Sequence, residues 1–206
     1  MRKVPLVKGE YYHIFNRGVD KRNIFFSESD FQRFLKSMGE FNTAQPIGSI
    51  YENSFRKVDK SKNKPLVEFT AYCLNPNHFH FILKQVAEDG IQKFMQRMGG
   101  YTKYFNEKHK RSGVLFQGKF KSVHIELNEQ LLYLSAYVNF NYLVHGLGSR
   151  TSKSSWEEYL NKKKTNLSDG RIILGQCRNL KEYEKMARET VNTIKEKRDM
   201  EKLLLE

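Results

Sequence analysis

One continuous stretch of the chain, residues 67–84, reads VEFTAYCLNPNHFHFILK. Residues 67–73 alternate as a strand with one buried face does, and residues 78–84 are again rich in strand-forming side chains. Between them, Leu74-Asn75-Pro76-Asn77 has the composition of a tight turn. The stretch therefore predicts an antiparallel β-hairpin whose second strand begins at His78.

Two histidines open that second strand. Successive side chains of a strand point to opposite faces, so His78 and His80 lie side by side on one face, whereas Phe79 and Phe81 lie on the other. Paired imidazoles on a rigid strand can hold a metal ion as two of its ligands. The same pattern is also compatible with a polar surface or with a hydrogen-bonded pair of core histidines.

The flanking sequence predicts an α+β domain. The predicted elements in chain order are a strand at 10–16, a helix at 27–42, the hairpin, a helix at 90–108 that is weak at Gly99-Gly100, a strand at 119–127, and a helix from Asn128 to about Val144. Residues 43–65 are predicted to be a long loop with a short strand at 50–51. The order β-α-β-β-α-β-α is that of a ferredoxin-like antiparallel sheet covered by helices.

The last part of the chain is expected to extend this domain. Beyond Gly148 we predict a Ser/Thr/Lys linker, a short helix at 156–160, the lysine run 162–164 and a long charged helix at 180–205. The expected division is a domain of residues 1–148 followed by a helical C-terminal extension of residues 149–206.

The charge of the chain points to a polyanionic partner. The 206 residues carry a formal net charge of +13, and this excess is concentrated between residues 92 and 121, where Glu107 is the only acid. The eight basic residues of this segment are Lys93, Arg97, Lys103, Lys108, Lys110, Arg111, Lys119 and Lys121. Such a concentration favours nucleic acid as the partner. Because no apolar run approaches the roughly 18 residues of a membrane span and no signal-peptide pattern is present, we expect a cytoplasmic protein without a membrane partner.

The helix predicted at 128–144 carries a candidate nucleophile. Tyr133, Tyr137 and Asn141 are spaced four apart and share one helix face. If that face turns toward the histidines, Asn141 can offer an oxygen to the same metal, and a tyrosine beside it can attack a phosphorus atom to form a phosphotyrosine. A phenol ionises near pH 10, so positive charge nearby must assist. Simple core packing is the alternative for these tyrosines.

Four ordered blocks between Gly9 and Leu147 resemble the HUH endonucleases, and among them most closely the REP-associated tyrosine transposases. The blocks are YHIFNRG at 12–18, YCLNPNHFH at 72–80, LFQGKFKS at 115–122 and YVNFN at 137–141. The resemblance implies that His78, His80 and Asn141 bind Mg²⁺ or Mn²⁺ and that Tyr137 is the nucleophile. It further implies an enzyme that cuts and rejoins single-stranded DNA next to hairpins through a 5′-phosphotyrosine.

Two positions depart from the family pattern. Asn141 is followed by YLVH at 142–145, where the family commonly continues Asn-Pro-Val-Arg-Ala, and Ala136 stands where an arginine is common. These departures leave the metal ligands intact but bear on DNA positioning and on activation of the nucleophile. Tyr133 and Tyr142 therefore stay open as alternative nucleophiles.

Residues that match the family blocks or line a basic groove are predicted to contact DNA. They are Arg17, Lys103, Lys110, Arg111, Gln117, Lys119 and Lys121. Tyr101, Tyr104 or Phe105 could stack a base, although core packing suits Phe105 better. No role is assigned to His13, His109, His124 or His145.

Two further functions are compatible with these residues. The sheet could serve as a nucleic-acid-binding platform without catalysis, as in a domesticated host protein. A bound metal could instead activate water for hydrolysis without a covalent intermediate. The sequence leaves the choice between a monomer and a homodimer open.

Overall fold

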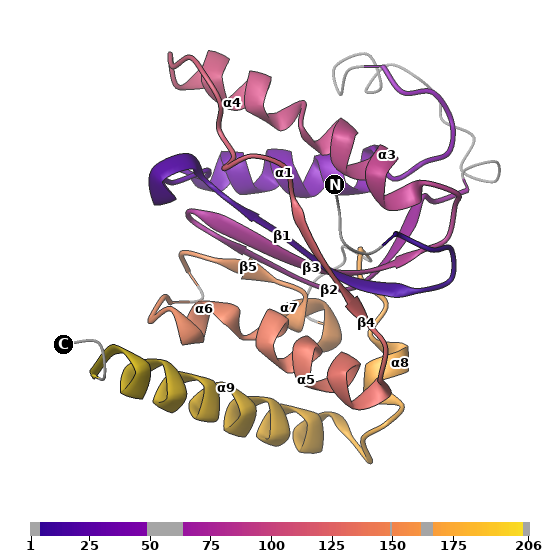
Figure 1. The fold of residues 1–206 in the computed structure, drawn as a ribbon, viewed down its shortest axis with the longest axis vertical. Coiled ribbons are helices and arrows are strands. Elements are labelled where there is room, and N and C mark those ends of the chain that lie inside the picture. The colour runs from indigo at the N-terminus through magenta and orange to yellow at the C-terminus, as the bar shows by residue number, and fades with distance from the viewer. Residues whose placement is uncertain (1–4, 49–63, 149, 162–166, 204–206) are drawn as a thin grey trace.

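The computed structural model describes residues 5–48, 64–148, 150–161 and 167–203. In this part of the chain a twisted antiparallel sheet lies between two layers of helices (Figure 1). The strands follow one another across the sheet in the order β4-β1-β3-β2-β5. Their bounds are Tyr11–Arg17 for β1, Val67–Asn75 for β2, His78–Gln85 for β3, Lys121–Ile125 for β4 and Lys153–Ser154 for β5. The expected α+β architecture is confirmed.

The predicted hairpin is present, but its turn is shorter than expected. Leu74 and Asn75 belong to strand β2, and the connection to β3 consists of Pro76 and Asn77 alone. Asn75 is therefore paired directly with His78 across the hairpin. The prediction that all of 74–77 forms the turn was wrong, because Leu74 and Asn75 still pair with β3 and therefore belong to β2.

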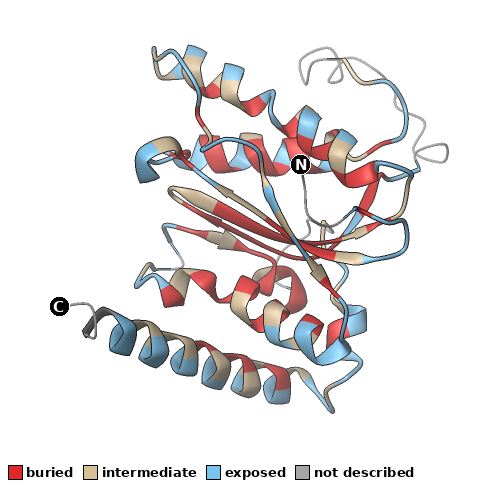
Figure 2. Ribbon diagram, viewed as in Figure 1, coloured by how far each residue is buried: buried red, intermediate tan, exposed pale blue. Residues whose placement is uncertain are grey.

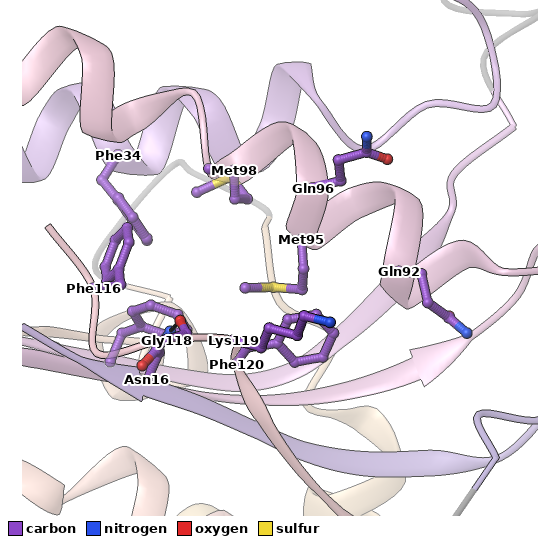
Figure 3. A pocket seen from close by; sticks show the side chains of 12 residues that line it. Asn16, Phe34, Gln92, Met95, Gln96, Met98, Phe116, Gly118, Lys119 and Phe120 are labelled. Atoms are coloured by element: carbon purple, nitrogen blue, oxygen red, sulfur yellow. Dashed lines mark hydrogen bonds between the residues drawn. The ribbon is translucent and has the colours of Figure 1, made fainter. Parts of the chain in front are cut away.

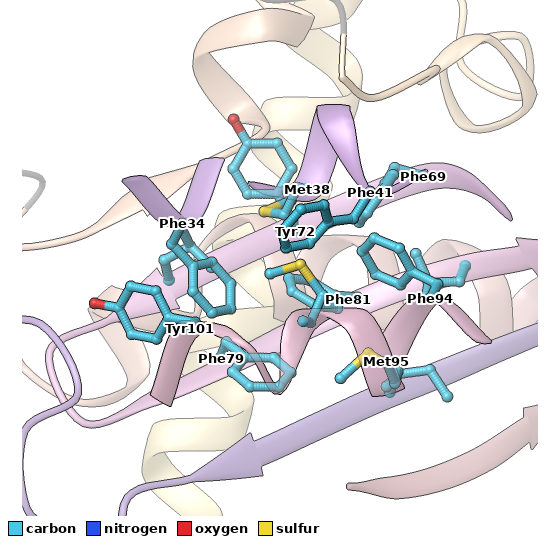
Figure 4. Packing of buried hydrophobic residues seen from close by; sticks show 14 of the residues in the cluster. Phe34, Met38, Phe41, Phe69, Tyr72, Phe79, Phe81, Phe94, Met95 and Tyr101 are labelled. Carbon is cyan, nitrogen blue, oxygen red and sulfur yellow. The ribbon is translucent and has the colours of Figure 1, made fainter. Parts of the chain in front are cut away.

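One helical layer packs on an apolar face of the sheet. It contains α1 (Glu28–Glu40), α3 (Gly90–Met98) and α4 (Tyr101–Lys108). A capping box formed by Ser27 and Asp30 begins α1, and the expected interruption at Gly99-Gly100 separates α3 from α4. Aromatic side chains from these helices and the sheet form the core in Figure 4. A short 3-10 helix, Val19–Lys21, precedes α1.

The other helical layer covers the opposite face of the sheet (Figure 1). It contains α5 (Asn128–Asn139), α6 (Asn141–Val144), α7 (Trp156–Tyr159), α8 (Arg171–Leu174) and α9 (Leu180–Leu203). Figure 2 shows that buried residues of these helices lie toward the sheet, while the outer side of α9 is exposed. The helix expected to run without a break to Val144 is interrupted at Phe140, whose side chain is buried beside Trp156 with ring centroids 5.0 Å apart.

The C-terminal extension takes part in this layer and in the sheet. Strand β5 pairs with β2, and helix α9 packs along α5. Ser155 accepts the backbone N–H of Tyr72 with its hydroxyl group at 2.9 Å, and the buried Tyr72 hydroxyl donates to Glu158 at 2.7 Å. The extension therefore helps to hold the helix that carries Tyr137.

Several sequence expectations are adjusted at their boundaries. Strand β4 is shorter than the predicted 119–127, and helix α5 starts at Asn128 itself, where Gln130 accepts the backbone N–H of Leu127 at 3.3 Å. The short strand expected at 50–51 lies outside the described residues. Within the described ranges, no helix combines the length and apolar character needed to cross a bilayer.

Candidate active site

His78 and His80 lie beside each other on the face of β3 that α5 and α6 cover. Their ring centroids are 5.2 Å apart, and the His80 ring is 5.4 Å from that of Tyr137 on α5. Phe79 and Phe81, which alternate with them, are buried in the opposite core. The predicted alternation of this strand is therefore confirmed, and it points both imidazoles toward α5, the helix that carries Tyr137.

Asn141 reaches the same point from the first residue of α6. Its Oδ1 atom is 3.0 Å from Nε2 of His78, and its side chain is fully buried. The interruption at Phe140 separates Asn141 from α5, so the predicted continuous stripe of Tyr133, Tyr137 and Asn141 is replaced by two helical segments. Asn141 and Tyr137 nevertheless both lie against the histidines.

The protonation of His78 is set by Asn77 in the hairpin turn. Asn77 donates through Nδ2 to the Lys21 carbonyl at 3.1 Å, which leaves its Oδ1 to accept from Nδ1 of His78 at 2.6 Å. Burial lowers the pKa of His78, so the ring is neutral and carries its one proton on Nδ1. The lone pair of Nε2 therefore points at the Oδ1 atom of Asn141.

His13 is the hydrogen-bond partner of His80, as Asn77 is of His78. Nε2 of His13 is 2.9 Å from Nδ1 of His80, and both rings are buried. Burial lowers the pKa of His13 to about 4 and that of His80 well below its ordinary value, so both are neutral. When Nδ1 of His80 donates to His13, Nε2 of His80 keeps a free lone pair. His13 is 67 residues from His80 and shares no local motif with it, so sequence reasoning missed it.

This donor set suits a hard divalent cation. Two ligands in adjacent positions of an octahedral Mg²⁺ or Mn²⁺ ion lie about 3.0 Å apart when each bond is about 2.1 Å. The 3.0 Å between His78 Nε2 and Asn141 Oδ1 matches this spacing. Among the described residues no three His, Cys, Asp or Glu side chains gather as a metal site, so an amide would supply the third ligand.

Tyr137 lies closer to the histidines than the two alternative tyrosines. Its ring meets His80 edge-on, and its centroid is 6.1 Å from that of His13. Tyr133 is 49% exposed on the outside of α5, and Tyr142 packs near Phe140. Burial raises the pKa of the Tyr137 phenol, while the Asn141 amide and the positive charge of Arg198 act in the opposite direction.

Arg198 and His145 complete the surroundings of the site. The His145 ring lies 4.6 Å from that of His78, and Nη1 of Arg198 is 3.4 Å from Nδ1 of His145. Arg198 comes from α9 and places a cation near a helix whose Ala136 lacks the family arginine. His145 lies four residues after Asn141 and so continues the spacing of Tyr133, Tyr137 and Asn141. Arg198 has no such spacing, because α9 reaches the site only through tertiary packing.

The predicted DNA-contacting residues fall into two groups. Arg17 pairs with His78 in the sheet, its Nε donates to Oε1 of Gln117, and its carbonyl accepts the Gln117 N–H at 2.8 Å. Lys121 is the first residue of β4 and lies opposite Phe15 of β1, whereas Lys119 lines a groove on the α3 face of the sheet, the face opposite the histidines. Lys103 is on α4 in the other helical layer, and Lys110 and Arg111 follow that helix. The structure thus does not bring the second group to the histidines.

A groove of about 790 Å³ lies beside Lys119 on the α3 face of the sheet (Figure 3). Met95 of α3 lies on one side, and Phe116 and Phe120 lie on the other. Tyr101 and Phe105, considered above for base stacking, are fully buried in the core, whereas Tyr104 is half-buried. The core therefore holds two of the three proposed stacking residues.

Comparisons with known proteins identify proteins that are similar in sequence and in fold. The family model described as "Transposase IS200 like" matches residues 7–141. A solved structure of a REP-associated tyrosine transposase bound to a REP hairpin is similar in fold, with a TM-score of 0.55 and 14% sequence identity. The similarity covers 82% of this chain and 88% of that one. No curated protein sequence matches the chain.

Proposed function

Because the chain belongs to the IS200-like transposase family, we propose that it cuts and rejoins single-stranded DNA next to hairpins through a covalent 5′-phosphotyrosine. Tyr137 is the nucleophile in this proposal. His78, His80 and Asn141 hold Mg²⁺ or Mn²⁺. Residues 1–148 form the catalytic domain, and residues 149–206 form the extension that supports it.

One observation carries the proposal, namely the convergence of three groups on one face of the sheet. The Tyr137 ring packs against His80, and the lone pairs of His78 Nε2 and Asn141 Oδ1 face each other at 3.0 Å. Two acceptor atoms held at this spacing can both bind one cation.

The bound metal would polarise the scissile phosphate and neutralise charge that develops on it. Tyr137 must lose its phenol proton, and Arg198 favours the tyrosinate. The tyrosinate oxygen then forms a bond to phosphorus while the bond from phosphorus to the 3′ oxygen breaks, and that 3′ oxygen takes up a proton. Attack by a 3′-hydroxyl on the phosphotyrosine reverses these steps and rejoins DNA.

The sheet end gives the DNA a place beside the reacting groups. Arg17 donates through Nε to Gln117 and pairs with His78 in the sheet, and Lys121 lies opposite Phe15 on β4. Phosphate contacts of this kind fix the register of a strand. The fold neighbour is bound to a REP hairpin, which supports a hairpin as the DNA element recognised here.

One copy of the chain contains the complete set of proposed reacting groups. Tyr137 on α5 contacts His80 on β3 of the same chain, and α9 of the same chain packs over α5. We therefore infer that a monomer can carry out cleavage. A homodimer that exchanges the tyrosine helix is the competing arrangement, and mixing His80→Ala with Tyr137→Phe chains tests it, since only exchange restores the adduct.

A covalent-adduct assay tests the proposed function. A 5′-hairpin oligonucleotide with single-stranded flanks, labelled on its 3′ flank, is incubated with the protein and Mn²⁺ and then denatured. The wild type should give a labelled band that Tyr137→Phe and His78→Ala lose, while the matched control Tyr133→Phe keeps it. Retention of the adduct by Tyr137→Phe would overturn the nucleophile. Binding that withstands EDTA without any wild-type adduct would instead indicate a non-catalytic binding protein.

A further inference from the structure

We propose that Asn75 is a fourth protein ligand of the divalent cation, and that its side-chain amide turns over when the ion binds. This inference rests on the proposed metal site of His78, His80 and Asn141. Asn75 was expected to lie in the hairpin turn, where it would have no part in the site. The structure instead makes it the last residue of β2, directly opposite His78.

Asn75 lies within hydrogen-bonding distance of two proposed ligand atoms at once. Its Nδ2 atom is 2.6 Å from Oδ1 of Asn141 and 2.8 Å from Nε2 of His78. The His78 and Asn141 atoms are themselves 3.0 Å apart, and Asn75 is completely buried. The three side chains therefore form a closed triangle of polar atoms.

The orientation of the Asn75 amide follows from the lone pairs that it meets. Asn77 fixes the proton of His78 on Nδ1, so Nε2 of His78 can only accept. Asn141 presents its carbonyl oxygen, which also accepts. An NH₂ group supplies two hydrogens, one for each acceptor, so the amide of Asn75 takes the position that a positive charge would otherwise fill.

A cation in this place cannot coexist with N–H groups that point at it. Rotation of the Asn75 side chain about its Cβ–Cγ bond exchanges Nδ2 for Oδ1 and turns a repelling group into a ligand. The opposite end of the amide opposes this rotation only weakly, because Oδ1 now accepts from the Cys73 thiol at 3.6 Å. After rotation, Nδ2 faces the same sulfur, which is a weak acceptor.

The distances of the triangle match one face of an octahedron. Adjacent ligands of Mg²⁺ or Mn²⁺ are about 3.0 Å apart. The three edges measured here are 2.6, 2.8 and 3.0 Å, so small outward shifts accommodate the ion. A second amide oxygen also increases the share of oxygen ligands, which favours Mg²⁺ and Mn²⁺ over Zn²⁺.

Titration of the DNA-free protein with Mn²⁺ tests this role without reference to activity. The electron paramagnetic resonance signal of free Mn²⁺ gives the bound fraction. Asn75→Leu, which keeps the size but removes the donor, should weaken Mn²⁺ binding by about tenfold or more. Asn75→Asp, which replaces the amide oxygen with a carboxylate, should strengthen binding by a similar factor.

The controls separate this inference from the proposed function. Far-UV circular dichroism and thermal unfolding in EDTA verify that each variant is folded, and Asn75→Asp gives an answer even if Asn75→Leu does not fold. If His78→Ala abolishes Mn²⁺ binding but Asn75→Leu leaves it unchanged or makes it tighter, Asn75 merely fills the site and its role as a ligand is refuted. If His78→Ala also leaves binding unchanged, the metal site itself is refuted.

Discussion

Phe79 and Phe81 lie on one face of strand β3 and His78 and His80 lie on the other, so one strand separates two chemically opposite surfaces. The first face meets α1, α3 and α4 in an aromatic core. The second meets α5 and α6, where buried imidazole and amide groups are held by specific partners. The apolar face favours stability. The polar face gives up part of that apolar packing to present lone pairs and a phenol in fixed positions.

The apolar face should show the largest effect on stability. Phe81 is fully buried and packs against Phe69 with ring centroids 5.5 Å apart. Phe81→Ala removes this packing and leaves a cavity, so we expect the free energy of unfolding to fall by about 3–5 kcal/mol. Urea unfolding followed by circular dichroism measures this. The control Val123→Ala, at a 50% exposed position on β4, should change stability little. A comparable loss in both variants would contradict the larger contribution to stability that is assigned here to the apolar face of β3.

Asp30 is the main polar exception within the apolar layer, and it should show the next largest effect. Burial alone would raise its pKa, but hydrogen bonds from the Lys108 ammonium group, the Phe26 N–H and the His109 ring outweigh burial and lower the pKa to about 2. Asp30→Asn leaves the Lys108 ammonium without its carboxylate partner, 2.6 Å away, and should cost about 2–3 kcal/mol at neutral pH.

The pH dependence of stability tests the same carboxylate. Because folding lowers this pKa below its ordinary 3.8, ionised Asp30 stabilises the protein above pH 3.8, and that contribution is lost as pH falls toward 2. The wild type should therefore lose more stability than Asp30→Asn over this interval in thermal unfolding. Parallel pH profiles for the two proteins would show that Asp30 is not the group responsible.

On the polar face, a buried hydrogen-bond network should have a smaller effect on stability. The Tyr183 hydroxyl of α9 accepts from Asn139 at 2.9 Å and pairs with Ser135 at 3.1 Å, both on α5. Tyr183→Phe leaves the Asn139 amide N–H without this partner, so a loss of about 1–2 kcal/mol is expected. Adduct formation should also decrease, since α5 carries Tyr137. Tyr133→Phe, on the exposed side of α5, serves as the control, and equal effects in both would contradict a role for the network.

The two faces also differ in how far the sequence predicts them. The alternation in β3, the capping residues Ser27 and Asp30 and the break at Gly99-Gly100 are local patterns, and each appears in the structure. Strand β5 contains only two residues and therefore has no periodicity to detect. The interruption at Phe140 depends on packing against Trp156, which comes from a distant segment.

Only those residues of the polar site that are close together in the sequence were predicted. His78 and His80 are adjacent on one strand, so their common face follows from the sequence. His13 and Arg198 reach the site from β1 and α9, and Asn75 reaches it because β2 continues two residues further than its turn-like composition suggests. Hydrogen bonds between distant segments have no sequence period, and these residues could be found only once the fold was known.

His13 gives the sharpest contrast between the two faces, because its removal should hardly affect stability. His13→Leu removes one hydrogen bond to a neutral histidine but places an apolar side chain in a buried position, so the free energy of unfolding should change by less than about 1 kcal/mol. Nδ1 of His80 then loses its partner, and the ring is free to turn or to change its tautomer. Mn²⁺ binding should weaken by about tenfold, as followed by electron paramagnetic resonance. Phe81→Ala, assayed in the same way below its unfolding transition, should retain Mn²⁺ affinity. If His13→Leu instead lost several kcal/mol of stability and kept its metal affinity, the histidine pair would belong to the core, and both faces of β3 would serve only to stabilise the fold.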